Sequence, residues 1–378
     1  MKRVAPIAVL VMLSVLAWTG GAAQQILFRH YTATDGLCSN TVWAAFQDKQ
    51  GYMWFGTKDG LNRFDGYSFK SFRYDPGDTA SLGGNAIRAI TGLGDDSCWI
   101  CTDTGVYVLD MSQQVFRLFK PVGRKPCLDL ITGPGDAVWI ATDQGVYRYQ
   151  VKTGRVTRFV HRKDDPNSLT QNFVRQLLVD DQGNIWMGTA WSGLDRYDPR
   201  RKTFTHYKAT GEPGALSSNF ITCLYKDSAG NIWVGTEKGG LDMWDRKTGR
   251  FTCYMHDGPN SISDNIVHTV YQPSPGKLYV GTEKGLDVLD IAKGSFTNYA
   301  CHANDPYGLN DNAVYVIYGD RQGGIWAGTY FGGVNYFCSG GGNFEFYYPT
   351  GAPGALSGKA VSAMLQGDSA NIGIGTED

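Results

Sequence analysis

The chain has 378 residues, of which 13% are aromatic, 49 are glycine and only 19% are charged. The formal net charge is −1 and no block of basic residues occurs, which argues against electrostatic binding of nucleic acid. Abundant aromatics and glycines are typical of an all-β protein with many tight turns, because aromatic side chains fill pleated surfaces and glycine adopts positive φ.

The first residues have the order of a secretory signal peptide. Lys2 and Arg3 precede an apolar run from Val4 to Trp18, and small residues follow at positions 20–23. The 15 residues of this run would span about 22 Å as a helix, which is short for a bilayer core of roughly 30 Å. We therefore predict that residues 1–23 are a cleaved signal peptide rather than an uncleaved anchor, and that the remainder is exported and soluble.

One motif recurs along the rest of the chain. Its clearest copy runs from Gly230 to Leu241 and reads Gly-Asn-Ile-Trp-Val-Gly-Thr-Glu-Lys-Gly-Gly-Leu. The aligned central residues of all copies, the last of them decayed, are Trp54, Trp99, Trp139, Trp186, Trp233, Tyr279, Trp326 and Gly373. Successive intervals are 45, 40, 47, 47, 46, 47 and 47 residues, and a near-constant period in the forties indicates a repeat architecture.

Each unit reads as four short strands separated by turn residues. In the fifth unit we expect strands at Ile221–Lys226, Asn231–Gly235, Gly240–Trp244 and Phe251–Met255. Four strands per unit and seven whole units predict an all-β fold, a seven-bladed β-propeller of four-stranded antiparallel blades. In the third unit the loop from Lys120 to Thr132 is short, which accounts for the interval of 40 residues.

The ends of the array decide the number of blades. Fourth strands are expected at Phe69–Tyr74, Phe116–Lys120, Thr157–Val160, Phe204–Lys208, Phe251–Met255, Phe296–Ala300 and Phe344–Tyr348. An additional strand, Phe28–Tyr31, precedes the first unit and is expected to help close the ring by pairing with a blade from the other end. We therefore assign residues 28–348 to a seven-bladed propeller. Residues 349–378 then form a truncated eighth repeat, the start of a second propeller; an eight-bladed ring that uses this repeat is the alternative.

Eight cysteines are scattered along the chain, and an even number in an exported protein invites disulfide bonds. They keep no obvious place in the repeat, however. Cys98 and Cys101 share one predicted strand with their side chains on opposite faces, so redox or zinc chemistry is disfavoured and buried thiols are expected.

The loops between units carry a second motif, seen as Asp-Pro-Asn-Ser-Leu at 165–169 and Gly-Pro-Asn-Ser-Ile at 258–262. Together with Asp-x-x-Gly-Asn-Ile-Trp-x-Gly-Thr-x-x-Gly-Gly-Leu, it resembles the two-component regulator propeller repeat over roughly residues 28–378. That family forms the periplasmic sensor of bacterial hybrid histidine kinases, notably the glycan-responsive systems of gut Bacteroidetes.

The resemblance implies a sensor that binds an oligosaccharide, acts as a homodimer in the full-length protein and feeds a phosphorelay. In the family, two propellers are followed by a β-sandwich, a membrane helix and a kinase. The present sequence holds none of these later modules, so membrane contact is expected only through missing downstream segments. By this interpretation the chain itself is not an enzyme and needs no cofactor.

One position of the first strand changes from unit to unit and is the best candidate for ligand binding. It follows a branched residue and is occupied by Trp43, Arg88, Arg175, Thr222, His268 and Tyr315, with Ser362 in the partial unit. First strands line the channel of a propeller, so these side chains are expected at its mouth. Aromatic faces and Arg forks suit a sugar, and we predict Trp43, Arg88, Arg175, His268 and Tyr315 as ligand-binding. The alternative is that they fill wedge-shaped gaps between blades.

Two turns between second and third strands depart from the usual Glu-Lys-Gly or Asp-x-Gly. They place Trp191 in the fourth unit and Tyr330 and Phe331 in the seventh, on the same face as the loops between units. Exposed aromatics mark recognition surfaces, so we add these residues to the ligand site. A contact with a second propeller or with a dimer partner is the alternative.

No catalytic or metal site is predicted. The recurring Asp48, Asp180, Asp227 and Asp320 suit turns better than paired catalytic carboxylates, and His30 and His206 occupy equivalent fourth-strand positions. The rival hypothesis is an exported propeller enzyme such as a lyase or glycosidase. It would use His268 and Tyr315 as base and acid, because the innermost set offers no carboxylic acid.

Overall fold

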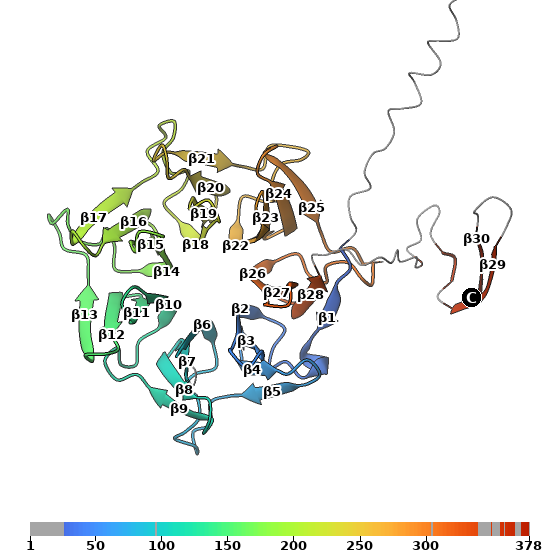
Figure 1. The fold of residues 1–378 in the computed structure, drawn as a ribbon, viewed down its shortest axis with the longest axis horizontal. Coiled ribbons are helices and arrows are strands. Elements are labelled where there is room, and N and C mark those ends of the chain that lie inside the picture. Colours follow the sequence, from blue (N-terminus) through green and yellow to red (C-terminus); the bar gives the residue numbers. More distant parts are fainter. Residues whose placement is uncertain are drawn as a thin grey trace, which may run out of the picture.

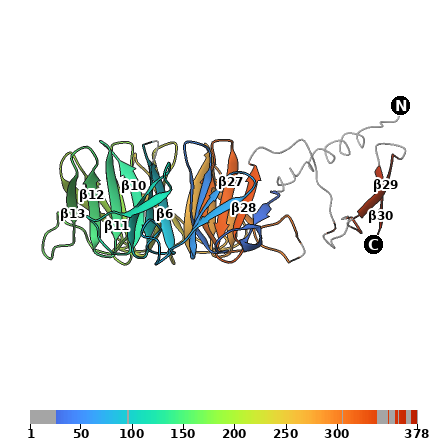
Figure 2. The same cartoon turned by 90° about the horizontal axis from the view of Figure 1, so that it is seen from below.

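The computed structural model describes residues 26–94, 97–303, 305–338, 349, 356–358, 360–366 and 372–377. Seven four-stranded antiparallel sheets surround a central axis, and a separate two-stranded sheet follows them in the chain. Figure 1 shows the seven sheets as blades around the axis, and Figure 2 shows the same ring edge-on as a flat disc. The seven-bladed prediction is confirmed, and the eight-bladed alternative is wrong.

The first three blades, numbered in chain order, are β2–β5 (Val42–Gln47, Met53–Thr57, Gly60–Phe64, Phe69–Phe72), β6–β9 (Ile87–Leu93, Ser97–Thr102, Gly105–Asp110, Val115–Leu118) and β10–β13 (Cys127–Gly133, Ala137–Thr142, Gly145–Gln150, Arg155–Phe159). Blades 4 to 6 are β14–β17 (Val174–Val179, Ile185–Thr189, Leu194–Asp198, Thr203–Tyr207), β18–β21 (Ile221–Lys226, Ile232–Thr236, Leu241–Trp244, Phe251–Tyr254) and β22–β25 (Val267–Ser274, Lys277–Thr282, Gly285–Asp290, Ser295–Tyr299). Blade 7 contains β26–β28 (Val314–Gly319, Gly324–Thr329, Val334–Cys338) and β1 (Arg29–Tyr31).

The ring is closed by its two ends. Strand β1 pairs antiparallel with β28, with Arg29 opposite Tyr336 and Tyr31 opposite Val334, so the leading strand is the outermost strand of blade 7. A single 3-10 turn, Ala33–Asp35, follows β1 and leads into blade 1. The predicted closure is confirmed.

The remaining terminal predictions have different outcomes. The signal peptide and the strand expected at Phe344–Tyr348 lie outside the described residues. The pair expected in the eighth repeat is present as the hairpin of β29 (Ala360–Gln366) and β30 (Ile372–Glu377). That this hairpin begins a second propeller stays a prediction.

The repeated motif is scaffold, and its glycine sets the distance between blades. A Cβ added at Gly188 would lie 2.6 Å from Cγ2 of Ile221 in the next blade, so only glycine permits this approach. The same contact recurs between Gly56 and Ile87. The branched partners are fully buried, and each removes apolar surface from water between two sheets.

Polar groups of the motif are satisfied locally. The indole nitrogen of Trp233 donates to Asp227 Oδ2 at 2.9 Å, which explains why an aspartate recurs in the turn after the first strand. The Thr236 hydroxyl donates to the carbonyl oxygen of Gly240 at 2.9 Å and closes the turn between the second and third strands. Equivalent Trp-to-Asp bonds form at Trp54, Trp186 and Trp326. The prediction that these aspartates serve the turns is therefore confirmed.

One blade interface replaces this packing with a covalent bond. In blade 2 the motif glycine is Cys101, and in blade 3 the branched residue is Cys127; the two form a disulfide with their Cα atoms 5.0 Å apart. The expectation that Cys101 is a buried free thiol is therefore wrong. Cys98, three residues earlier, lies on the opposite face in the core between blades 1 and 2, as expected.

We predict that this disulfide stabilises the interface between blades 2 and 3, as the glycine contact does at the other interfaces. Loss of the bond through Cys127→Ser should lower the free energy of unfolding by roughly 3 kcal/mol, the value for a closed loop of this size. The double variant Cys101→Gly, Cys127→Val restores the pair found at other interfaces and should recover much of this loss. Denaturant titration with and without dithiothreitol measures both effects. A wild-type midpoint that does not respond to dithiothreitol would contradict the prediction.

Candidate functional site

In all seven blades the innermost strand carries a β-bulge at the same place. The ladder to the second strand skips one residue there, so that one side chain per blade has no cross-strand partner. The skipped residues, from blade 1 to blade 7, are Trp43, Arg88, Leu128, Arg175, Thr222, His268 and Tyr315. We call them the bulge residues. A bulge bends its strand and re-aims a side chain, and bulges are common next to functional sites.

The bulge residues gather around the axis. The innermost strands β2, β6, β10, β14, β18, β22 and β26 contact one another in sequence around the ring, and Figure 1 shows them nearest its centre. The charge of Arg88 interacts with Arg175 and Tyr315, which come from blades 4 and 7. Residues from distant repeats therefore share one space, the channel mouth.

Aromatic rings from blades 6 and 7 form a continuous row at the mouth. His268 stacks on Tyr315 with ring centroids 4.0 Å apart and planes 16° apart. Tyr315 contacts Tyr330 at 5.4 Å, and Tyr330 meets Phe331 edge-on at 4.6 Å. The row ends at Phe331, which is 72% exposed. Four of the predicted ligand-binding residues thus lie in one aromatic surface.

Cationic side chains occupy another part of the mouth. The guanidinium of Arg88 lies 3.8 Å from the ring centroid of Trp43 in the preceding blade, a cation–π contact. Burial lowers the pKa of Arg88, and Arg175 lowers it further by repulsion, while Asp103 opposes the shift. Arg175 itself lies 3.6 Å from Glu237 Oε2 of blade 5.

The carboxylates of this site are not among the residues predicted from the sequence. Glu237 and Glu283 directly follow the motif threonine, at the start of the turn between the second and third strands. His268 Nε2 lies 2.7 Å from Glu283 Oε2. Burial nevertheless holds the pKa of His268 below its usual range, although Glu283 acts in the opposite direction. The sequence does contain a sign of their role, because the residue after the motif threonine varies between units as the bulge residue does. From blade 1 to blade 7 it is Lys58, Asp103, Asp143, Ala190, Glu237, Glu283 and Tyr330.

Trp191 lies apart from this cluster. It is 53% exposed on the turn of blade 4 and contacts Phe173, with ring centroids 5.3 Å apart. Its backbone N–H donates to Gln171 Oε1 at 3.1 Å. None of the ring contacts between described residues joins Trp191 to the channel mouth, so the structure brings together seven of the eight predicted residues and leaves Trp191 on the neighbouring rim.

The other candidate residues have structural roles. His206 Nδ1 bonds Asp195 Oδ1 at 2.7 Å and its Nε2 donates to the carbonyl oxygen of Pro166 at 2.8 Å. His30, on β1, donates in the same way to the carbonyl oxygen of Gly308 at 2.8 Å. Both therefore fasten a loop between blades. Within the described ranges no group of three His, Cys, Asp or Glu side chains could hold a metal ion.

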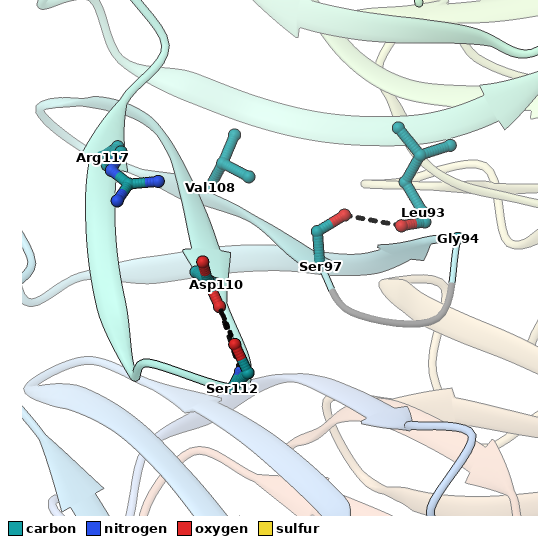
Figure 3. A pocket seen from close by; sticks show the side chains of 7 residues that line it. All are labelled: Leu93, Gly94, Ser97, Val108, Asp110, Ser112 and Arg117. Atoms are coloured by element: carbon teal, nitrogen blue, oxygen red, sulfur yellow. Dashed lines mark hydrogen bonds between the residues drawn. The ribbon is translucent and has the colours of Figure 1, made fainter.

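A hollow of about 640 Å³ lies on blade 2, at the ends of β6 and β7 far from the bulge (Figure 3). Its polar groups bond one another: Ser112 Oγ donates to Asp110 Oδ1 at 2.7 Å, and Ser97 Oγ donates to the Leu93 carbonyl at 2.5 Å. The hollow therefore offers few free polar groups and is a weaker candidate than the channel mouth.

Directly below the mouth, one buried carboxylate links two blades. Asp129 follows the bulge of blade 3 and accepts hydrogen bonds from the N–H groups of Leu130 and of Leu177 in blade 4, both at 2.8 Å. Burial raises its pKa to about 7. Blades 1 and 2 have alanine at this position, Ala44 and Ala89.

Comparison with known proteins identifies the repeat. Residues 36–59, 168–191, 215–238 and 308–331 match the two component regulator propeller. These four segments are two component regulator propeller repeats. The matched segments begin in a loop between blades and end in the turn after the second strand, so each contains one bulge and one glycine contact.

Two relatives connect the chain to two-component systems. It is 46% identical over 56 residues to histidine kinase P4 of Formosa agariphila, a match that covers 15% of this chain and 4% of that protein. The extracellular domain of a protein described as a hybrid two component system of B. thetaiotaomicron superposes with a TM-score of 0.76 at 25% identity. That match covers 93% of this chain and 47% of the solved domain, so the chain spans about half the length of this relative.

A third similarity concerns the fold alone. A virginiamycin B lyase from Staphylococcus aureus superposes with a TM-score of 0.62 at 11% identity, over 83% of this chain and 99% of the lyase. Among the residues that the structure describes, no helix has the length and apolar character needed to cross a bilayer.

We predict that Asp129 makes stability depend on pH. Its folded-state pKa lies above the unfolded value of about 3.9, so the folded state holds the proton more tightly. The contribution to unfolding free energy is therefore complete below pH ~4 and is lost as the pH rises to about 7, by up to ~1.4 kcal/mol per pH unit. Asp129→Asn removes the titration, and Asp129→Ala copies blades 1 and 2.

The measurement is the difference in unfolding free energy between wild type and each variant at pH 5, 6, 7 and 8. Because other ionisable groups cancel in this difference, the cost of either substitution should be largest at pH 5 and smallest at pH 8. A cost that stays constant or grows with pH would show that Asp129 is ionised in the folded protein.

Proposed function

We propose that the chain is a ligand-sensing propeller from the extracellular, periplasmic part of a hybrid two-component histidine kinase, and that its channel mouth binds a saccharide. The observation that carries the proposal is the ring of bulge residues. The repeated motif forms the scaffold, and seven bulges present seven side chains at one mouth. These side chains differ between blades, whereas most of the packing residues repeat.

The chemistry of the mouth suits a sugar. A pyranose ring has an apolar face of C–H groups, which packs on aromatic rings such as Tyr315 and Tyr330, and a rim of hydroxyl groups. Arg88, Arg175, Glu237 and Glu283 surround this surface with donors and acceptors that can bond those hydroxyls. A predominantly apolar surface with a few convergent polar groups is the usual form of a small-ligand site.

Signalling requires that the ligand bind two states of the sensor with different affinity. In the proposed full-length protein, a glycan breakdown product at the mouth shifts the arrangement of propellers and of the partner protomer in a homodimer. The shift crosses the membrane through segments that follow this chain, and a phosphorelay carries it further.

The enzyme hypothesis has less support. A lyase would need His268 and Tyr315 on opposite sides of a substrate, as base and acid. The two rings instead stack on each other with centroids 4.0 Å apart, which leaves no space for a substrate between them. The lyase superposition supports only the fold.

The proposal predicts that removal of an aromatic face weakens saccharide binding. Calorimetry of the chain against a panel of plant and host oligosaccharides should identify a ligand. Tyr315→Ala and His268→Ala should each reduce its affinity by roughly 3- to 10-fold, the worth of one aromatic contact.

The matched control is Tyr67→Ala. Tyr67 is 97% exposed on the turn between β4 and β5, on the other face of the disc, and its loss should leave affinity unchanged. Equal affinity of wild type, Tyr315→Ala and His268→Ala would exclude the channel mouth as the saccharide site.

A further inference from the structure

The bulge residues are distributed unevenly around the mouth. In blade order they read Trp43, Arg88, Leu128, Arg175, Thr222, His268 and Tyr315. In a closed ring of seven, blade 3 faces blades 6 and 7, and Figure 1 shows β10 across the axis from β22 and β26. The two arginines therefore flank Leu128 on one side, and the stacked His268 and Tyr315 occupy the other.

Arg88, the arginine of blade 2, packs on an aromatic ring but forms no hydrogen bond or ion pair with the described residues. Its guanidinium packs on the Trp43 ring at 3.8 Å, which restricts its rotamers. Within the part of the chain that the structure describes, Arg88 has neither a hydrogen bond nor an ion pair, and its side chain is exposed to the channel. Its N–H donors, which match the two oxygens of a carboxylate or sulfate group, are therefore available.

The arginine of blade 4 has a partner that a ligand can replace. The Arg175–Glu237 pair has an N–O distance of 3.6 Å, and the two side chains are 38% and 43% exposed. An exposed pair of this kind contributes only about 0–1 kcal/mol, so exchange of Glu237 for a ligand anion costs little.

The setting of Arg88 favours an anion near the two arginines. Burial is the main reason that the pKa of Arg88 is lowered; Asp103 raises this pKa without forming an ion pair, and repulsion from Arg175, a smaller effect, lowers it. Leu128, the bulge residue between them, contributes no charge and little hydration. A negative group bound here would interact with both guanidinium groups in a partly desolvated setting, where such contacts are stronger than in bulk water.

We propose that the ligand is an acidic saccharide, whose carboxylate or sulfate group binds Arg88 and Arg175 while its ring packs on Tyr315 and Tyr330. This inference rests on the proposed function and adds the chemical class of the ligand. It also assigns unequal roles to the mouth residues: the aromatic row holds any pyranose of suitable shape, and the two arginines select for charge.

The test compares sugars that differ only at C6. The full chain is titrated with methyl galactoside, the methyl glycoside of galacturonic acid and methyl galactoside 6-sulfate, and with the corresponding glucose compounds, at low and at 0.5 M salt. Tryptophan fluorescence reports binding, because Trp43 lies under Arg88, and a Trp43→Phe variant identifies its share of the signal. We expect an acidic sugar to bind at least ~10-fold more tightly than its neutral counterpart, with a preference that shrinks at high salt.

The variants assign this preference to residues. Arg88→Gln should remove most of the preference, because the acidic sugar loses more affinity than the neutral one, while Arg88→Lys, which keeps the charge but loses the fork, should be intermediate. Arg117→Gln, an exposed arginine on the outer strand β9 of the same blade, should change nothing. The carboxylate and sulfate arms show which acidic group the site takes.

Two results would overturn the inference in distinguishable ways. If neutral sugars bind as tightly as acidic ones, or if the preference survives in both Arg88→Gln and Arg175→Gln, the ligand class is wrong and the saccharide site stands. If no compound of either kind binds, the proposed function of the mouth fails together with the inference.

Discussion

The ring depends on one close approach, that of the motif glycine of each blade to a branched residue of the next. This contact fixes the branched residue completely, and the branched residue begins the innermost strand at full burial. The ladder then skips the very next residue. A residue whose size and shape are fixed by packing is therefore followed directly by one that can vary. Ile87 must fit against Gly56, whereas Arg88 needs only to reach the channel. A repeat protein can vary its mouth in this way without disturbing the spacing of its blades.

Blade 3 departs from the pattern, and the structure compensates on both of its sides. The indole nitrogen of Trp139 is buried without a hydrogen-bond partner, unlike that of Trp233. The Cys101–Cys127 disulfide joins blade 3 to blade 2, and the hydrogen bond that Asp129 accepts from the Leu177 amide joins it to blade 4. Cys127 and Asp129 bracket the bulge residue Leu128. Three consecutive residues thus hold the irregular blade in place and supply its part of the mouth.

The fold could be predicted from the sequence because the repeat spacing and the turn residues mark the four strands of each blade independently of the other blades. The closing role of β1 could also be expected, since Phe28–Tyr31 is a fourth strand without a blade. The bulges could not be foreseen, because a skipped residue does not interrupt the apolar pattern around Val174 or Val267. Glu237 and Glu283 have the sequence pattern of ordinary turn residues, and their contacts with Arg175 and His268 depend on which side chains the first strands present. Cys101 and Cys127 have no obvious place in the repeat when the sequence is read alone, although they replace the two residues that touch at other interfaces. The strand register shows this equivalence, because Cys127 pairs with Thr142 as Ile87 pairs with Thr102, and Cys101 pairs with Ala89 as Gly56 pairs with Ala44.

The closure of the ring has a mechanical consequence. Strand β1 holds blade 7 through three residue pairs, the Phe28–Phe337 ring contact and the bond from the Phe28 amide to the Tyr307 carbonyl oxygen. Its partner strand is synthesised some 300 residues later, so closing the joint costs more loop entropy than any other strand pairing in the ring, and we expect it to form late in folding. The chain also leaves the ring from β28, the other side of the same joint. A force applied to the chain after Cys338 would act on the short β1–β28 pairing before it acts on any other blade. Blade 7 also supplies Tyr315 and Tyr330. We therefore expect that a ligand bound at the mouth and a force on the chain after Cys338 would both act on this blade.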